Sequence, residues 1–203
     1  VKAIESTPDE LQVVLENGET CPADVVIVST GVKPRLHYLE GCDIDIDQGI
    51  VVDAHMQTNQ PDVYAAGDCA QGLDFSTGET AVHAVQPTAT EHGRIAAANM
   101  VGNNNLPYKG SLNMNILDTL GLVTCSFGAW EGVAGGESAE MYNPDNHQYV
   151  NLQFKDDVLV GANSVGYHEH LGVLRGLIET QIPLGEWKDR LKENPVNLVD
   201  AYQ

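Results

Sequence analysis

The chain has 203 residues, enough for one large domain or two small ones with an adequate core. Its formal net charge of −19 argues against nucleic-acid binding, which needs a basic surface. Hydrophobic residues make up 42% without a long apolar run, so we expect a soluble protein that does not span a membrane. The acidic surface could dock a basic partner, but solubility alone explains it equally well.

The first residues of the chain and its cysteines predict the kind of protein it was cut from and its cellular location. The sequence begins at Val1 with no initiator methionine and no signal-peptide pattern, which predicts a cut inside a longer protein. Four cysteines, Cys21, Cys42, Cys69 and Cys125, lie far apart and form no Cys-x-x-Cys pair. This spacing predicts neither a metal cage nor a local redox pair and fits a reducing, cytoplasmic location.

The first stretch predicts strands. Residues 2–6 and 11–15 flank a turn, and Asn17-Gly18 closes a second one. Residues 24–29 form a short, continuous apolar run, which is typical of a strand buried on both faces of a parallel sheet. This run leads into Ser29-Thr30-Gly31, which could also be an ordinary strand-to-loop turn.

The most informative segment is the approach to Gly67-Asp68. Polar residues at 58–62 lead into a short apolar strand predicted at 63–66, which ends on the glycine and then the acid. Gly67 has no Cβ, so a bulky ligand can come close to the backbone there. Asp68 would lie at the edge of a sheet and accept hydrogen bonds from a polyol.

A helix is predicted next. Thr88-Ala89-Thr90-Glu91 matches a capping box, Pro87 precedes it, and Gly102 follows the last apolar residue. The small residues within 95–100 allow close packing on a sheet. The polar run 103–107 is the best domain boundary in the chain.

Beyond this boundary the pattern is strand-rich. Strands are predicted at 112–117, 122–127, 148–154 and 158–165, with turns at Gly121, 143–145 and 156–157 and helices at 168–181 and 184–193. Tyr167-His168-Glu169-His170 has no evident third metal ligand, so we interpret it as a polar helix start and predict no metal site.

Gly67-Asp68 resembles the second flavin-binding fingerprint of the pyridine nucleotide-disulfide oxidoreductase superfamily. The segment through Ser29-Thr30-Gly31 resembles the exit from the NAD-binding domain of these reductases. The strand-rich end is similar to the C-terminal domain of the NADH–rubredoxin reductase and nitrite-reductase-like branch. The resemblance implies an α/β plus α+β fold. Residues 1–32 would be a remnant of the NAD-binding domain, 33–105 the second segment of a Rossmann-like, three-layer FAD-binding domain, and 106–203 a C-terminal interface or dimerisation domain.

The same resemblance implies FAD as the cofactor and NAD(P)H as the co-substrate. The residues it assigns to cofactor binding are Gly31, Gly67, Asp68, Gln86, Pro87 and Thr88. Asp68 would hold the ribityl hydroxyls, and the turn at 86–88 would face the pyrimidine edge, where free N–H groups suit negative charge. Gly31 would let the backbone cross a domain junction near the cofactors. No side chain is expected to act as a general acid or base.

Motifs that the sequence lacks limit which branch of the superfamily it resembles and how strongly it should bind FAD. No Gly-x-Gly-x-x-Gly occurs, so we expect the chain by itself to bind FAD weakly or not at all and to lack reductase activity. No His-Pro-Thr motif is present, and His83-Ala84-Val85-Gln86-Pro87 replaces the Arg-x-Glu-x-Trp segment of oxygenase ferredoxin reductases. An electron-transfer reductase or NADH oxidase type remains, with a protein or small-molecule acceptor.

Two further expectations concern association. A truncated sheet should expose apolar edges, so we expect a homo-oligomer. The alternative to an enzyme is a non-enzymatic dimerisation or docking module whose acidic face meets a basic partner.

Overall fold

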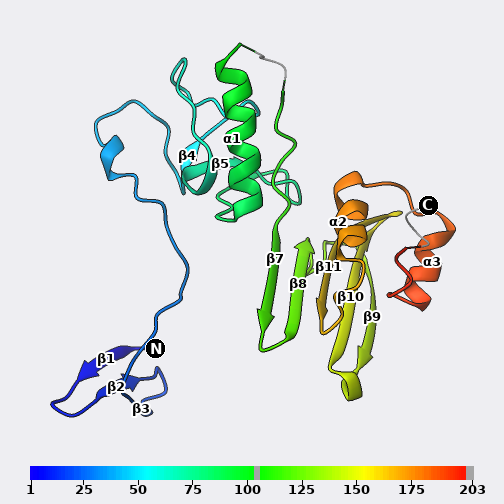
Figure 1. Cartoon of the computed structure of the whole chain (residues 1–203), viewed down its shortest axis with the longest axis horizontal. Coiled ribbons are helices and arrows are strands. Elements are labelled where there is room, and N and C mark those ends of the chain that lie inside the picture. The colour runs from blue at the N-terminus through cyan, green and yellow to red at the C-terminus, as the bar shows by residue number, and fades with distance from the viewer. Residues whose placement is uncertain (103–105, 200–203) are drawn as a thin grey trace. The chain divides into compact units, whose positions relative to one another are not determined.

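The computed structural model describes residues 1–102 and 106–199 (Figure 1). The chain divides into two compact units, Val1–Lys33 and Pro34–Gln203, each of which is described by itself. Within the described ranges, no helix combines the length and the apolar character needed to cross a bilayer.

The first unit is a small antiparallel sheet. Strands β1 (Ala3–Ser6), β2 (Leu11–Val14) and β3 (Thr20–Ala23) pair in the order β1-β2-β3. In the first turn, the Glu10 N–H donates to Thr7 Oγ1 at 3.1 Å. In the second, Gly18 has a φ of +86°, which glycine adopts without strain. The predicted strand pair and both turns are therefore confirmed.

The predicted buried strand at 24–29 is wrong. These residues form no strand, and Val25, Ile27 and Val28 are 73%, 85% and 66% exposed. A strand of a parallel sheet is buried only when neighbouring strands and covering helices surround it. No strand in the described part of the chain pairs with this segment, so its apolar side chains remain in solvent.

The second unit begins with a helix packed on a small sheet. After the 3₁₀ turn η1 (His37–Leu39), its elements are β4 (Ile50–Val51), η2 (Gly67–Cys69), β5 (Ala70–Leu73), β6 (Thr80–Ala81) and α1 (Gln86–Met100). Strand β4 pairs in parallel with β5, and β5 pairs antiparallel with β6. Figure 1 shows α1 running alongside β4 and β5. Ile50, Val52, Met56, Ala65, Ala70, Ile95, Ala96 and Tyr108 form the buried core.

Two local predictions need correction here. The strand expected at 63–66 is only an isolated bridge between Gln57 and Tyr64, because this segment bonds to its own preceding loop and then turns into η2. Helix α1 begins at Gln86 rather than at a capping box, because Pro87 is well suited to the first helical turn. Thr88 is therefore a buried helical residue. The predicted C-terminal end is confirmed, since Gly102 has a φ of +86°.

The rest of the second unit is a five-stranded antiparallel sheet with two helices. Its strands are β7 (Met114–Thr119), β8 (Leu122–Gly128), β9 (Glu137–Asn143), β10 (Gln148–Lys155) and β11 (Val158–Val165), in the order β7-β8-β11-β10-β9. The 3₁₀ turn η3 (Pro144–Asn146) joins β9 to β10, and α2 (Leu171–Thr180) and α3 (Glu186–Glu193) complete the described fold. The four predicted strands are confirmed to within two residues, and β9 was not predicted.

In β10 and α2, the most deeply buried side chains are alternate residues of the strand and the residues along one side of the helix. Val150, Leu152 and Phe154 on β10 are 0% exposed. Helix α2 contributes Leu174 and Ile178, which are 1% exposed, to the same core cluster. It begins at Leu171, three residues later than predicted, because His170 has a φ of +61°. Alternate residues of β10 therefore face one core, as half-buried strands require.

The turn between β7 and β8 projects from this core. Leu120 is fully exposed with a φ of +54°, and Gly121 follows with +85°. The Gly121 N–H donates to Asp118 Oδ1 at 2.9 Å. Ile116 and Leu117 on β7 are also about half exposed. The hairpin tip thus contributes little to the core.

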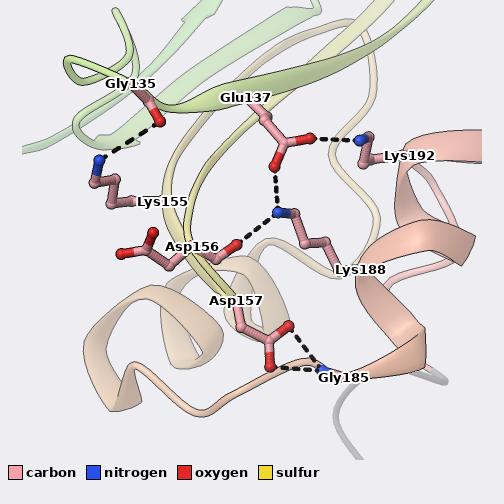
Figure 2. Close-up of polar contacts among 8 residues, drawn as sticks. All are labelled: Gly135, Glu137, Lys155, Asp156, Asp157, Gly185, Lys188 and Lys192. Carbon is pink, nitrogen blue, oxygen red and sulfur yellow. Dashed lines mark hydrogen bonds and ion pairs between the residues drawn. The ribbon is translucent and has the colours of Figure 1, made fainter.

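The turn between β10 and β11 is tied to α3 instead (Figure 2). The Gly185 N–H donates to both carboxylate oxygens of Asp157, at 3.0 and 3.1 Å. Lys188 donates to the Asp156 carbonyl at 2.6 Å and to the Glu137 carboxylate. Lys192 donates to the same carboxylate at 2.5 Å. Glu137 on β9 thus joins two lysines of α3.

These lysines make the stability of the second unit pH-dependent. Hydrogen bonds from Lys188 and then Lys192 lower the pKa of Glu137 from 4.5 to about 2. Because the folded pKa is the lower one, the stabilisation is present above about pH 4.5 and is lost as pH falls toward 2. We expect Glu137→Gln to flatten the fall in melting temperature over this window, measured by near-ultraviolet circular dichroism. Glu131→Gln, at an exposed position, should leave the wild-type profile unchanged.

Candidate functional site

The Gly67 turn lies directly against helix α1. Ala66 is extended, and Gly67 then takes a φ of +76°, which other L-residues rarely adopt. A Cβ added to Gly67 would lie 3.4 Å from the Cβ of Ala89. Glycine at 67 and alanine at 89 therefore let the turn approach the first half of the helix closely.

Asp68 presents a free carboxylate beside this contact. The residue is exposed, and within the described ranges its carboxylate takes part in no hydrogen bond or ion pair. It lies in the 3₁₀ turn η2 rather than at a strand end, which corrects the sequence expectation. An unpartnered anion next to a close backbone approach can accept charge-assisted hydrogen bonds from hydroxyl groups.

The N-terminus of α1 is the second part of the site. Gln86 and Pro87 are exposed, whereas Thr88 is 5% exposed. No side chain caps this end of the helix. The first-turn N–H groups therefore offer donors and the positive end of the helix dipole to an electronegative ligand.

A cavity of about 450 Å³ lies next to this helix end. It is lined by Gln86, Pro87, Thr90, Glu91 and Arg94 of α1 together with Arg175 of α2. A larger cavity, of about 610 Å³, lies beside Asn99 and Gly102 at the other end of α1 and contains none of the predicted site residues. The smaller cavity contains two of the predicted site residues, Gln86 and Pro87, but not Gly67, Asp68 or Thr88.

The structure gathers five of the six predicted residues around η2 and the start of α1. Gly31, the sixth, belongs to the first unit, where it is exposed with a φ of +98°. Its role stays a prediction.

His92 is a site residue that sequence reasoning missed. It is 1% exposed, and the Gly67 N–H donates to its Nδ1 at 3.3 Å. Burial and then His83 lower its pKa from 6.5. The available signal was its spacing: Thr88, His92, Ile95, Ala96 and Asn99 form the inner stripe of α1. A polar residue in such a stripe predicts that its side chain has a buried hydrogen-bond partner. The pattern does not identify that partner.

A second histidine lies beside a buried carboxylate in the segment before α1. His83 Nε2 lies 2.9 Å from Asp74 Oδ2, and both side chains are about nine-tenths buried. The other Asp74 oxygen accepts the Ser76 and Thr77 N–H groups at 2.7 and 3.0 Å. Across the described residues, no cluster of three or more His, Cys, Asp or Glu side chains could hold a metal ion.

The mixed sheets and three helices of the described residues give an α/β fold. Residues 1–88 match the family model for pyridine nucleotide-disulphide oxidoreductases. The epsilon subunit of the NADH-dependent phenylglyoxylate dehydrogenase of Aromatoleum evansii is 34% identical over 198 residues. The chain belongs to the pyridine nucleotide-disulfide oxidoreductase superfamily. This confirms the family resemblance inferred from its sequence.

Solved structures agree with this fold. A NAD-dependent persulfide reductase from A. fulgidus matches with a TM-score of 0.78 and 26% identity, over 90% of this chain and 37% of that one. Putidaredoxin reductase, in its covalent complex with putidaredoxin, matches with a TM-score of 0.83 and 22% identity, over 99% of this chain and 48% of that one. The expected fold class is confirmed.

The match to the dehydrogenase subunit covers 97% of this chain and 47% of that protein. The chain thus spans about half the length of this curated relative.

Proposed function

We propose that this chain supplies the second flavin-binding segment and the C-terminal domain of an FAD-dependent NAD(P)H oxidoreductase. The observation that carries this is the Gly67–Asp68 turn, held against α1 with its carboxylate free. Family membership supports the same assignment, because the matching model covers this turn and the helix start. The likeness to an NADH-dependent relative supports NAD(P)H as the electron donor.

The residues present fit a flavin dinucleotide. Gly67 has no Cβ to fill the space at the turn, Asp68 has an unpartnered carboxylate, and the start of α1 is uncapped. Asp68 would accept hydrogen bonds from the ribityl hydroxyls, and residues 86–88 would meet the pyrimidine edge. We assign Gly31 to the junction leading toward the cofactors.

When bound, the flavin supplies the hydride and electron-transfer chemistry of such an enzyme. The chain's own residues orient that group and stabilise its charge. The dipole of α1 favours negative charge at its N-terminus. We propose no general acid or base among them.

We extend this proposal to organisation and partners. Residues 1–32 would belong to the NAD-binding domain, 33–105 to the FAD-binding domain, and 106–203 to the C-terminal domain. The acceptor would be a redox protein or a small molecule; the putidaredoxin complex of a protein with this fold supports the former. We also propose a cytoplasmic homo-oligomer, supported by exposed apolar side chains such as Ile116 and Leu117 on edge strand β7. The isolated chain should bind FAD weakly, because its sequence contains no Gly-x-Gly-x-x-Gly loop.

Asp68→Ala tests the central assignment. Loss of a charge-assisted hydrogen bond should weaken FAD binding about 10- to 100-fold. The measurements are quenching of flavin fluorescence for this chain and bound FAD per protein for the full-length enzyme. Asp145→Ala, an exposed acid in η3, is the matched control and should bind FAD like the wild type. Equal affinity of the Asp68 variant and the control would refute the role of Asp68.

A further inference from the structure

We propose that His92 positions the Gly67–Asp68 turn as a neutral imidazole whose Nδ1 accepts the Gly67 N–H. The effect of this contact on flavin binding rests on the proposed function above. The effect on the turn itself depends only on this chain.

The hydrogen bond determines the tautomer of His92. Gly67 N lies 3.3 Å from Nδ1, and this bond links η2 to a helix residue 25 positions later. A ring nitrogen accepts an N–H only when it carries no proton of its own. The neutral ring therefore carries its proton on Nε2, which is buried and has no hydrogen-bond partner among the described residues.

The surroundings hold the ring in one orientation. A Cβ added to Gly72 of β5 would lie 3.5 Å from both Cε1 and Nε2 of His92, so the imidazole packs against bare backbone there. The Tyr108 ring meets it edge-on, with centroids 4.6 Å apart and planes at 87°. With sheet backbone on one side and an aromatic ring on another, Nδ1 stays directed at the turn.

The groups that face His92 keep it uncharged. His83, from the segment before α1, and burial both lower its pKa. Tyr108 follows α1, and burial is the main cause that raises its pKa to about 12, with smaller contributions from Glu91 and Asp74, so it stays neutral at physiological pH. The Tyr108 hydroxyl is also hydrogen-bonded to Ser111 Oγ.

Protonation would reverse the contact. A charged imidazole carries a proton on Nδ1, so two donors would face each other at Gly67. Because the folded pKa of His92 is lowered, the stabilisation is complete above about pH 6.5 and is lost as pH falls toward the folded value. The adjacent Asp68 would then lose its fixed position.

The test compares His92→Leu, which removes the acceptor, with His92→Gln, whose amide oxygen can replace it. We expect hydrogen exchange of the Gly67 amide to rise roughly 3- to 10-fold in the leucine variant, as for loss of one neutral hydrogen bond. The glutamine variant should restore protection to within about twofold of wild type. FAD affinity should follow the same order. When the pH is lowered from about 7.5 through the lowered pKa of His92, the protection factor of the Gly67 amide, which corrects for the slower intrinsic exchange in acid, should fall in the wild type but not in the glutamine variant.

Ile95→Val is the matched control, because it removes one methyl group from the same inner face of α1 without touching Gly67. If the leucine variant exchanges Gly67 no faster than this control, the proposal is overturned. Nitrogen NMR of wild-type His92 gives an independent answer, since a proton on Nδ1 at pH 7.5 would also overturn it. If the leucine variant does not fold, the nitrogen NMR spectrum of wild-type His92 and the Gly67 exchange of the glutamine variant still test the proposal. Absence of FAD binding by the wild-type full-length enzyme would refute the proposed function, while Gly67 exchange would still decide the role of His92.

Discussion

Phe154→Ala is expected to lower the free energy of unfolding of the second unit by about 3–5 kcal/mol, the usual cost of removing a fully buried phenyl ring. Phe154 is 0% exposed and belongs to the core cluster formed by the five-stranded sheet, α2 and α3. Its neighbours cannot collapse into the cavity easily, because Val150 and Leu152 on the same strand are equally buried. Urea unfolding followed by the fluorescence of Trp130 and Trp187 measures the change.

Leu120→Ala is the control for this substitution. Leu120 is fully exposed at the β7–β8 turn, so its truncation should change stability by no more than about 0.5 kcal/mol. A loss at Phe154 as small as that at Leu120 would contradict the assignment of β10 to the core.

Gly161→Ala should cost about 3 kcal/mol, the upper end of the usual range for overpacking. A Cβ at this position would lie 2.3 Å from the carbonyl carbon and oxygen of Ala129 and 2.7 Å from the Trp130 nitrogen. These are backbone atoms, and Ala129 is held by the hydrogen bond from its N–H to the Val160 carbonyl at 3.0 Å. The strand and the loop cannot separate without losing that bond. The same urea titration measures the effect.

The identical substitution at Gly93 should have the opposite sign. Gly93 is an exposed position in the interior of α1, and no atom lies within 4 Å of an added Cβ. Alanine there should stabilise the protein by about 0.5–1 kcal/mol, because glycine loses more backbone entropy in a helix. Destabilisation by both substitutions would show that glycine replacement in general, rather than close approach at Gly161, causes the loss.

The sequence predicted the strands that turn residues delimit. Residues Val158–Val165 coincide with a predicted strand, which follows the turn predicted at 156–157. Strand β9 was missed because Glu137–Asn143 is polar and only Ala139 in it is buried. This edge strand forms because β10 supplies its hydrogen-bonding partners. The sequence of residues 137–143 alone does not reveal that pairing.

The apolar run at 24–29 is the opposite case, a predicted strand that does not form. Its composition predicts a buried strand correctly only when other strands are present to surround it. Within the described ranges none pairs with it, and Val25 and Ile27 face solvent.

The candidate site was predictable where it is local. Gly67 and Asp68 adjoin in sequence, and Pro87 indicates a helix start. The contact between Gly67 and His92 was not predictable, because it depends on how η2 and α1 pack together. The exposed Asp68 carboxylate likewise could be known only after the turn was located.

Two of the hairpin turns of the C-terminal sheet, β7–β8 and β10–β11, differ in how well they would tolerate an inserted peptide. The β10–β11 turn anchors the loop before α3 through Asp157 and Gly185, so an inserted peptide there would displace the terminal helix. The β7–β8 turn carries only an exposed leucine and a local Asp118–Gly121 bond. A fluorescent label or an affinity tag grafted at Leu120–Gly121 would therefore report on the protein while leaving its core intact.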